Sequence, residues 1–90
     1  MLQHVNITVS GKVQGVFYRA ATEKVARELD ITGWVQNLPS GEVYIEAEGT
    51  EEQLRQFTDW CRKGPSRATV TAVEIVPSEV RGFAGFTIRR

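Results

Sequence analysis

The segment from Gly11 to Arg19 holds the residue types best suited to binding an anion. Gly11 and Gly15 permit backbone conformations in which successive N–H groups point to one side, and such a nest of N–H groups binds negative charge. Arg19 follows near the start of a predicted helix, where unbonded N–H groups and the helix dipole also favour an anion. Its planar guanidinium can hold two oxygens of one phosphate or carboxylate. The segment therefore predicts a small oxyanion site.

Asn37 is a second polar candidate, because its amide can both accept from and donate to a water molecule without ionising. Plainer interpretations of these residues stay open on spacing alone. Gly15 could simply form a turn, and Arg19 could be a solvated helix residue, since short glycine motifs often occur by chance. Asn37 precedes the segment Leu38–Gly41, which is a context typical of an asparagine near a turn.

A different phosphate chemistry is suggested by Cys61 and Arg67, which have the spacing of phosphatases that use a cysteine nucleophile. In those enzymes the cysteine lies in a loop before a helix. Cys61 instead lies at the end of a predicted helix, where the negative end of the dipole raises the pKa of a thiol. We therefore interpret Cys61 as part of a helix-packing stripe and not as a nucleophile.

The remaining titratable residues suggest neither an acid–base pair nor a metal site. His4 is expected on the solvent face of the first strand, without a partner. Glu46 and Glu48 share one strand face, and residues 51–52 are acidic because they open a helix. With one histidine and one cysteine in the whole chain, we expect no bound metal and no cofactor.

The first half of the chain predicts a strand, a helix and a hairpin. Residues 5–9 alternate apolar and polar side chains, as in a strand with one buried face. A helical stripe follows at four-residue spacing, and Gly33 is expected to end that helix; the stripe comprises Ala21, Val25 and Leu29. Two extended stretches joined by a turn complete the hairpin, at residues 34–38, 39–41 and 43–47.

The second half predicts a helix and two strands. Thr50 and Gln53 have the spacing of a capping box, which marks a helix start, and residues 64–65 (Gly-Pro) end that helix. Residues 68–77 are rich in β-branched side chains, as in a strand, and residues 86–89 alternate again after a glycine-containing loop.

This order of elements, strand-helix-strand-strand-helix-strand plus a short last strand, is typical of a ferredoxin-like α+β sandwich. Two helices would then pack on one face of an antiparallel sheet. Residues 1–90 are expected to form a single domain, since a chain of this length can bury a core without a metal or a disulfide. RNA-recognition modules share the same element order, so the fold alone does not decide the function.

Two motifs narrow the choice of function. Residues 11–19, GKVQGVFYR, resemble the first signature of the acylphosphatase family at every specified position. Residues 33–37, GWVQN, resemble the second signature, and its later positions follow at the expected intervals: Gly41, Val43 and Gly49. The chain is thus identified as similar to a small acylphosphatase over essentially its whole length, which implies hydrolysis of the carboxyl-phosphate bond of acylphosphates.

The resemblance also implies a role for each residue of the two motifs. Arg19 would neutralise the phosphate and Asn37 would hold the attacking water, with no covalent intermediate and with the proton passing to a phosphate oxygen of the substrate. The backbone N–H groups of six residues would cradle the phosphate: Gln14, Gly15, Val16, Phe17, Tyr18 and Arg19. Acetyl phosphate, carbamoyl phosphate and a bisphosphoglycerate are candidate substrates. Inorganic phosphate or sulfate would compete for the same cradle.

The charge balance argues against large anionic partners. Eleven basic and eleven acidic residues cancel, so no long-range positive field would attract a nucleic acid or an anionic membrane. The chain shows no leader-like pattern and no long apolar span, which makes a cytoplasmic monomer the expectation. A noncatalytic phosphate-sensing module is a further alternative, although binding alone would not need Asn37.

Overall fold

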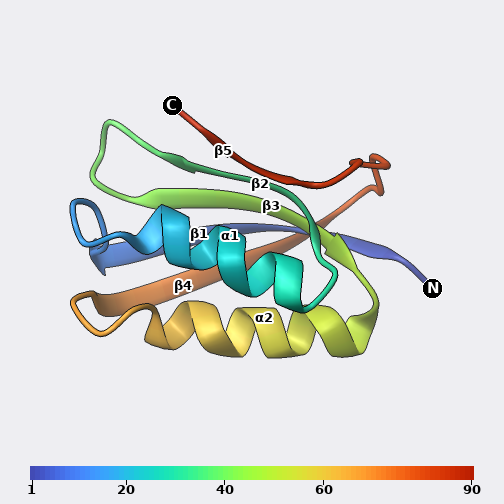
Figure 1. Ribbon diagram of the computed structural model, residues 1–90, viewed down its shortest axis with the longest axis horizontal. Coiled ribbons are helices and arrows are strands. Elements are labelled where there is room, and N and C mark those ends of the chain that lie inside the picture. Colours follow the sequence, from blue (N-terminus) through green and yellow to red (C-terminus); the bar gives the residue numbers. More distant parts are fainter.

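The computed structural model describes residues 1–90 and contains the predicted elements in the predicted order (Figure 1). Their bounds are β1 (Gln3–Lys12), α1 (Tyr18–Glu28), β2 (Thr32–Asn37), β3 (Val43–Gly49), α2 (Glu51–Lys63), β4 (Thr69–Ser78) and β5 (Phe86–Arg89). Neither helix is both long and apolar enough to cross a membrane.

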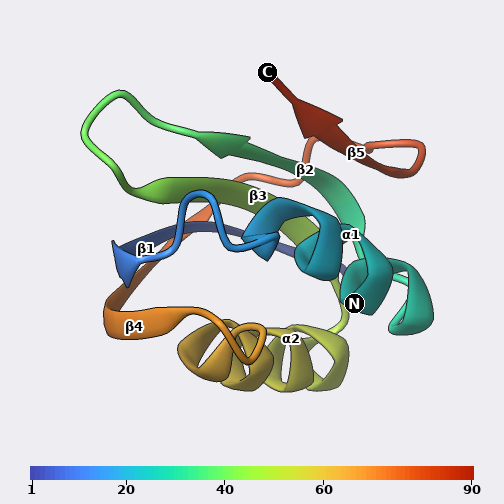
Figure 2. The ribbon, with the colours of Figure 1, turned by 60° about the vertical axis from the view of Figure 1, so that its left-hand side comes forward.

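The five strands form one sheet in the order β4-β1-β3-β2-β5, with both helices on the same face (Figures 1 and 2). Helix α1 packs beneath β2 and β5, and α2 packs beneath β3 and β4. The first four strands pair antiparallel, as predicted, but β5 pairs parallel with β2. The sheet is therefore mixed, because β5 lies at its edge and runs in the same direction as β2.

The α2 helix confirms its predicted ends. The Thr50 hydroxyl accepts from the Gln53 backbone N–H at 3.2 Å, and the Gln53 side chain accepts from the Thr50 backbone N–H at 2.8 Å. This reciprocal capping box satisfies two N–H groups that a helix start otherwise leaves unpaired. Gly64 follows Lys63 as the C-cap, with a positive φ of 69° that favours glycine. The buried face includes Leu54, Phe57 and Cys61.

The α1 helix differs from the prediction in its buried face and in its end. Tyr18, Thr22 and Ala26 are the buried residues, while the predicted stripe lies beside them at intermediate depth. Both sets have the same four-residue spacing, but a pattern of apolar residues does not include threonine. Thr22 can be buried because its hydroxyl donates to the Tyr18 carbonyl at 2.7 Å. The helix ends at Glu28, not at Gly33.

Gly33 instead lies within β2, where its role is close approach between strands. Its φ is 140°, and a Cβ at this position would fall 1.8 Å from the Glu46 carbonyl oxygen of β3. The chain reverses earlier, through Asp30 with a φ of 59°. A glycine after a helical pattern was thus assigned to the helix end, although β3 is the element that requires it.

The core lies between the sheet and the two helices. It is built from the inward residues of the strands, such as Ile7, Val9, Val35 and Ile45, packed against Phe57 of α2. The alternation that predicted these strands therefore also predicted which side chains face the helices.

The opposite face of the sheet is covered in part, and this contradicts the expectation that His4 is exposed. His4 is 1 % exposed, because the segment linking β4 to β5 crosses over it and Phe83 stacks near its ring, with centroids 5.7 Å apart. The two ring nitrogens of His4 lie 2.8 Å from a Glu48 oxygen and 3.0 Å from a Glu46 oxygen. Alternation placed His4 correctly on the outer face, but a segment distant in sequence buries it.

Glu48 fastens that linking segment to the sheet. Its carboxylate is 2 % exposed and accepts from the backbone N–H groups of Arg81, Gly82 and Phe83. Burial raises the pKa of the Glu48 carboxyl, but the hydrogen bonds from the Arg81 N–H, the His4 ring and the other two N–H groups outweigh it, so the folded-state pKa lies below the ordinary value of 4.5. We call this carboxylate with its three N–H donors the Glu48 clamp.

Stability should therefore fall in acid through the Glu48 clamp. Because the folded-state pKa is lowered, the stabilisation is complete above the ordinary pKa of 4.5 and is lost as the pH drops through the folded value. Glu48→Gln should lower the free energy of unfolding by ~1–3 kcal/mol at neutral pH, because buried N–H groups lose a charged acceptor. It should also flatten the acid dependence.

Urea denaturation from neutral pH down to acid, on the parent and on Glu48→Gln, measures both effects. Glu74→Gln is the matched control, since Glu74 is an exposed glutamate on β4. A Glu48→Gln protein as stable as the Glu74→Gln protein would refute the contribution of the clamp.

Candidate active site

The loop between β1 and α1 has the backbone form of an anion nest. Gly15 has a φ of 75° and Phe17, the residue before α1, has a φ of 64°. None of the backbone N–H groups from Gln14 to Phe17 donates to a backbone carbonyl, and the first N–H groups of α1 lack helical partners. Phe17 is a non-glycine residue with a left-handed backbone conformation. This conformation is strained for such residues, and residues of this kind are frequent at functional sites. The loop thus presents a run of unpaired donors.

The side chain of Gln14 fixes this loop to the hairpin between β2 and β3. Its Nε2 donates at 2.8 Å to the Leu38 carbonyl and at 2.8 Å to the Glu42 carbonyl. From the sequence, only the backbone N–H of Gln14 was expected to take part in the site. The side-chain role depends on a contact distant in sequence, and it brings the loop close to Asn37, the residue before Leu38.

Tyr18 anchors the start of α1 to α2 and is buried. Its hydroxyl donates at 2.8 Å to the Cys61 carbonyl, and its ring lies 5.4 Å from that of Trp60. Burial, together with the nearby Cys61, raises the pKa of Tyr18, so the hydroxyl stays protonated as a donor. The side chain therefore positions the helix start, and only the backbone N–H of Tyr18 remains as a candidate for anion contact.

Arg19 and Asn37 both line one pocket of about 360 Å³. Arg19 is partly buried and forms no ion pair with an acidic side chain of the protein. Asn37 ends β2, and its Oδ1 is the only buried side-chain nitrogen or oxygen without a hydrogen-bond partner in the protein. A buried polar atom without a partner requires an explanation, and a bound water is one that the chemistry supplies.

Five of the predicted site residues meet at this pocket. Gly15, Phe17, Tyr18, Arg19 and Asn37 line it, whereas Gln14 and Val16 do not. Val16 is 3 % exposed and belongs to the core, so its side chain holds the loop down while its N–H stays unpaired. The pocket also includes four residues that no sequence pattern marked as site residues, namely Val13, Ala20, Ile88 and Arg90.

Cys61 lies away from this pocket and is chemically quiet. The side chain is fully buried, and burial raises the pKa of the thiol to about 12, against weaker opposing effects of Tyr18 and Arg62. Arg67 lies in the turn after α2, and no helix follows Cys61 to activate a thiolate. The interpretation of Cys61 as a packing residue is confirmed.

Comparisons with known proteins agree with this geometry. The family model described as acylphosphatase matches residues 5–88. An acylphosphatase of Marinobacter nauticus is 52% identical over 82 residues, which cover 91% of this chain and 87% of the relative, and one of Methylococcus capsulatus is 43% identical over 90 residues, covering 99% and 98%. A solved acylphosphatase structure from Coxiella burnetii superposes with a TM-score of 0.95 at 40% identity, covering 98% of this chain and 93% of that one.

Proposed function

The chain belongs to the acylphosphatase family and hydrolyses acylphosphates to a carboxylate and orthophosphate, and we propose the following roles for its residues. The loop N–H groups from Gln14 to Arg19 bind the phosphoryl oxygens. Arg19 neutralises their charge. Asn37 places the attacking water in line with the bond to the leaving carboxylate.

The observation that carries the proposal is the convergence of unpaired donors and one unpaired acceptor on a single pocket. The N–H groups of Gln14–Phe17 make no backbone hydrogen bonds, Arg19 has no acidic partner, and Asn37 Oδ1 has no partner at all. A tetrahedral dianion would satisfy the first two, and a water donating to Asn37 Oδ1 would satisfy the third.

The chemistry needs no further protein group. An acylphosphate has a carboxylate as its leaving group, so binding, charge stabilisation and alignment of water supply most of the catalysis. As the water oxygen bonds to phosphorus, the bond from phosphorus to the acyl oxygen breaks and its electrons leave with the carboxylate. The water proton passes to a phosphoryl oxygen, since no carboxylate, histidine or cysteine lines the pocket. No covalent enzyme intermediate forms.

We propose that residues 1–90 act as one domain and as a cytoplasmic monomer on small acylphosphates. Arg19 and Asn37 meet in one pocket within one copy of the chain, so the proposed site needs no residue of a second copy. The only cysteine is buried and would form no disulfide with a partner.

Inorganic phosphate and sulfate should inhibit competitively, because each presents a tetrahedral oxyanion to the same donors as the substrate. The measurement is the rate of benzoate release from benzoyl phosphate at increasing inhibitor concentration, with a strong chelator present throughout.

Turnover should persist in the chelator, because Arg19 and the loop N–H groups occupy the place that a metal has in most phosphoryl-transfer sites. Noncompetitive inhibition, or rescue by a divalent ion, would contradict the proposed cradle.

A further inference from the structure

The last strand contributes a second arginine to the pocket. Because β5 pairs parallel with β2, Val35 lies beside Ile88 and Gln36 beside Arg89. Asn37 is the next residue of β2, Arg90 directly follows the end of β5, and both line the pocket with Ile88. Side chains alternate between the faces of a strand, so Arg90 shares the helix-facing side with Ile88, and Arg89 takes the opposite side.

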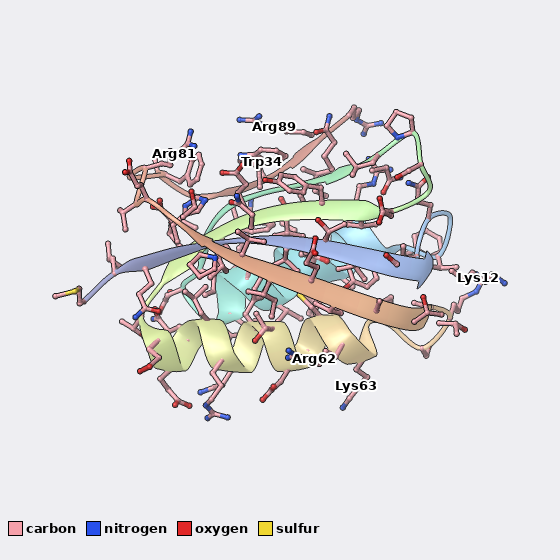
Figure 3. All side chains as sticks on the ribbon, turned by 180° about the vertical axis from the view of Figure 1, so that it is seen from behind. Lys12, Trp34, Arg62, Lys63, Arg81 and Arg89 are labelled. Atoms are coloured by element: carbon pink, nitrogen blue, oxygen red, sulfur yellow. The ribbon has the colours of Figure 1, made fainter.

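Arg89 confirms this alternation. Its guanidinium carbon lies 4.0 Å from the ring centre of Trp34, and the two labelled residues lie together on the sheet face away from the helices (Figure 3). Two adjacent arginines with the same charge therefore serve opposite faces of one strand. Of Arg89 and Arg90, only Arg90 lines the pocket.

The side chains that line the pocket include no counterion for Arg90. Two arginines line the pocket, Arg19 and Arg90, and no aspartate or glutamate does. Arg90 forms no ion pair elsewhere in the protein. The phosphoryl group of an acylphosphate is a dianion near neutral pH, so one guanidinium balances only half of its charge.

We propose that Arg90 is a second cation for the phosphoryl group, reaching it from β5 while Arg19 reaches it from α1. The inference rests on the proposed function, because it takes the loop and Arg19 as the phosphate cradle. Arg90 is exposed, so its contribution is a screened Coulomb attraction that acts on bound substrate and transition state alike. It should lower KM and the inhibition constant of phosphate, with little effect on kcat.

The experiment compares Arg90→Gln with Arg89→Gln, two variants that remove the same charge from opposite faces of one strand. Benzoyl phosphate kinetics and the inhibition constant of inorganic phosphate are measured at low and high salt, after thermal unfolding has shown that both variants are folded. Arg90→Gln should raise KM and the inhibition constant by about three- to tenfold at low salt, as for an exposed ion pair worth up to ~1 kcal/mol or slightly more. High salt should shrink the difference.

Arg89→Gln should match the parent in these constants, and Arg90→Lys should restore most of the lost affinity, since an attraction of this kind needs charge and no planar fork. Equal effects of Arg90→Gln and Arg89→Gln would overturn the proposal, because net charge alone would then explain them. The proposal would also be overturned if Arg90→Gln left the inhibition constant of phosphate unchanged and raised KM only for substrates with a charged acyl group, such as succinyl phosphate.

The two hypotheses fail in distinguishable ways. If phosphate does not compete with substrate in the parent protein, the proposed cradle is wrong. If phosphate competes in the parent and Arg90→Gln leaves its constant unchanged, the cradle stands and only the role of Arg90 is wrong.

Discussion

Replacing Arg19 with glutamine is expected to lower the rate of acylphosphate hydrolysis by at least ~10²-fold, as for loss of a preorganised donor to a charged transition state. Arg19 faces the pocket without an acidic partner, so its charge is available to the substrate. Glutamine is shorter and uncharged and cannot span two phosphoryl oxygens. Because Arg19 would contact the phosphate before and during the reaction, phosphate affinity and kcat should fall together.

Two variants sharpen this test. Arg19→Lys keeps the charge but lacks the planar fork, so it should recover little activity. Arg27→Gln removes an arginine from the last turn of the same helix, where Arg27 pairs with Glu23 at 3.2 Å outside the candidate pocket. Near-normal kinetics are expected for that control. An Arg19→Gln protein that is folded and retains parent kinetics would remove Arg19 from the mechanism.

Replacing Asn37 with alanine should separate turnover from binding. The side chain ends β2 with a buried Oδ1 that no protein group satisfies, and we assign that oxygen to the attacking water. Without the amide the water loses its alignment, so kcat should drop by roughly 10²-fold or more. The loop donors and Arg19 remain, so the inhibition constant of phosphate should stay close to that of the parent.

The control for Asn37 is Gln36→Ala, which removes an amide from the neighbouring residue on the other face of β2 and outside the pocket. Its kinetics should be normal. Asn37→Asp should lose both turnover and phosphate affinity, since a carboxylate would repel the phosphoryl group. If Asn37→Ala abolishes phosphate binding while a folded Arg19→Gln protein retains it, the two roles are assigned the wrong way round.

Local patterns in the sequence predicted the elements well, because their causes are local. The capping box of Thr50 and Gln53 involves residues three apart, and the alternation of β1 reports its own two faces. The burial of His4 could not be predicted in the same way. It results from a segment almost eighty residues further along the chain that crosses the outer face of the sheet.

The candidate site likewise contains residues that local patterns indicated and residues that depend on contacts distant in sequence. Gly15 and Arg19 indicated an anion site because a nest and a helix start are made by neighbouring residues. The Gln14 side chain and Arg90 were missed, because one acts through the hairpin carbonyls and the other through parallel pairing of β5 with β2. The alternation of Phe86 and Ile88 already implied the face of Arg90, but it gave no sign of which strand would lie beside it.

The position of β1 inside the sheet, between two other strands, sets how much of the chain must be synthesised before the candidate site can form. The loop after β1 leaves the ribosome before the other parts of the pocket, yet β1 is held between β3 and β4, and Ile88 of the pocket wall is on β5. The pairing of β1 with β4 closes a loop of more than half the chain, and such non-local closures slow folding. The residues of the proposed phosphate cradle are therefore made early, whereas the complete pocket forms only after β5 has emerged.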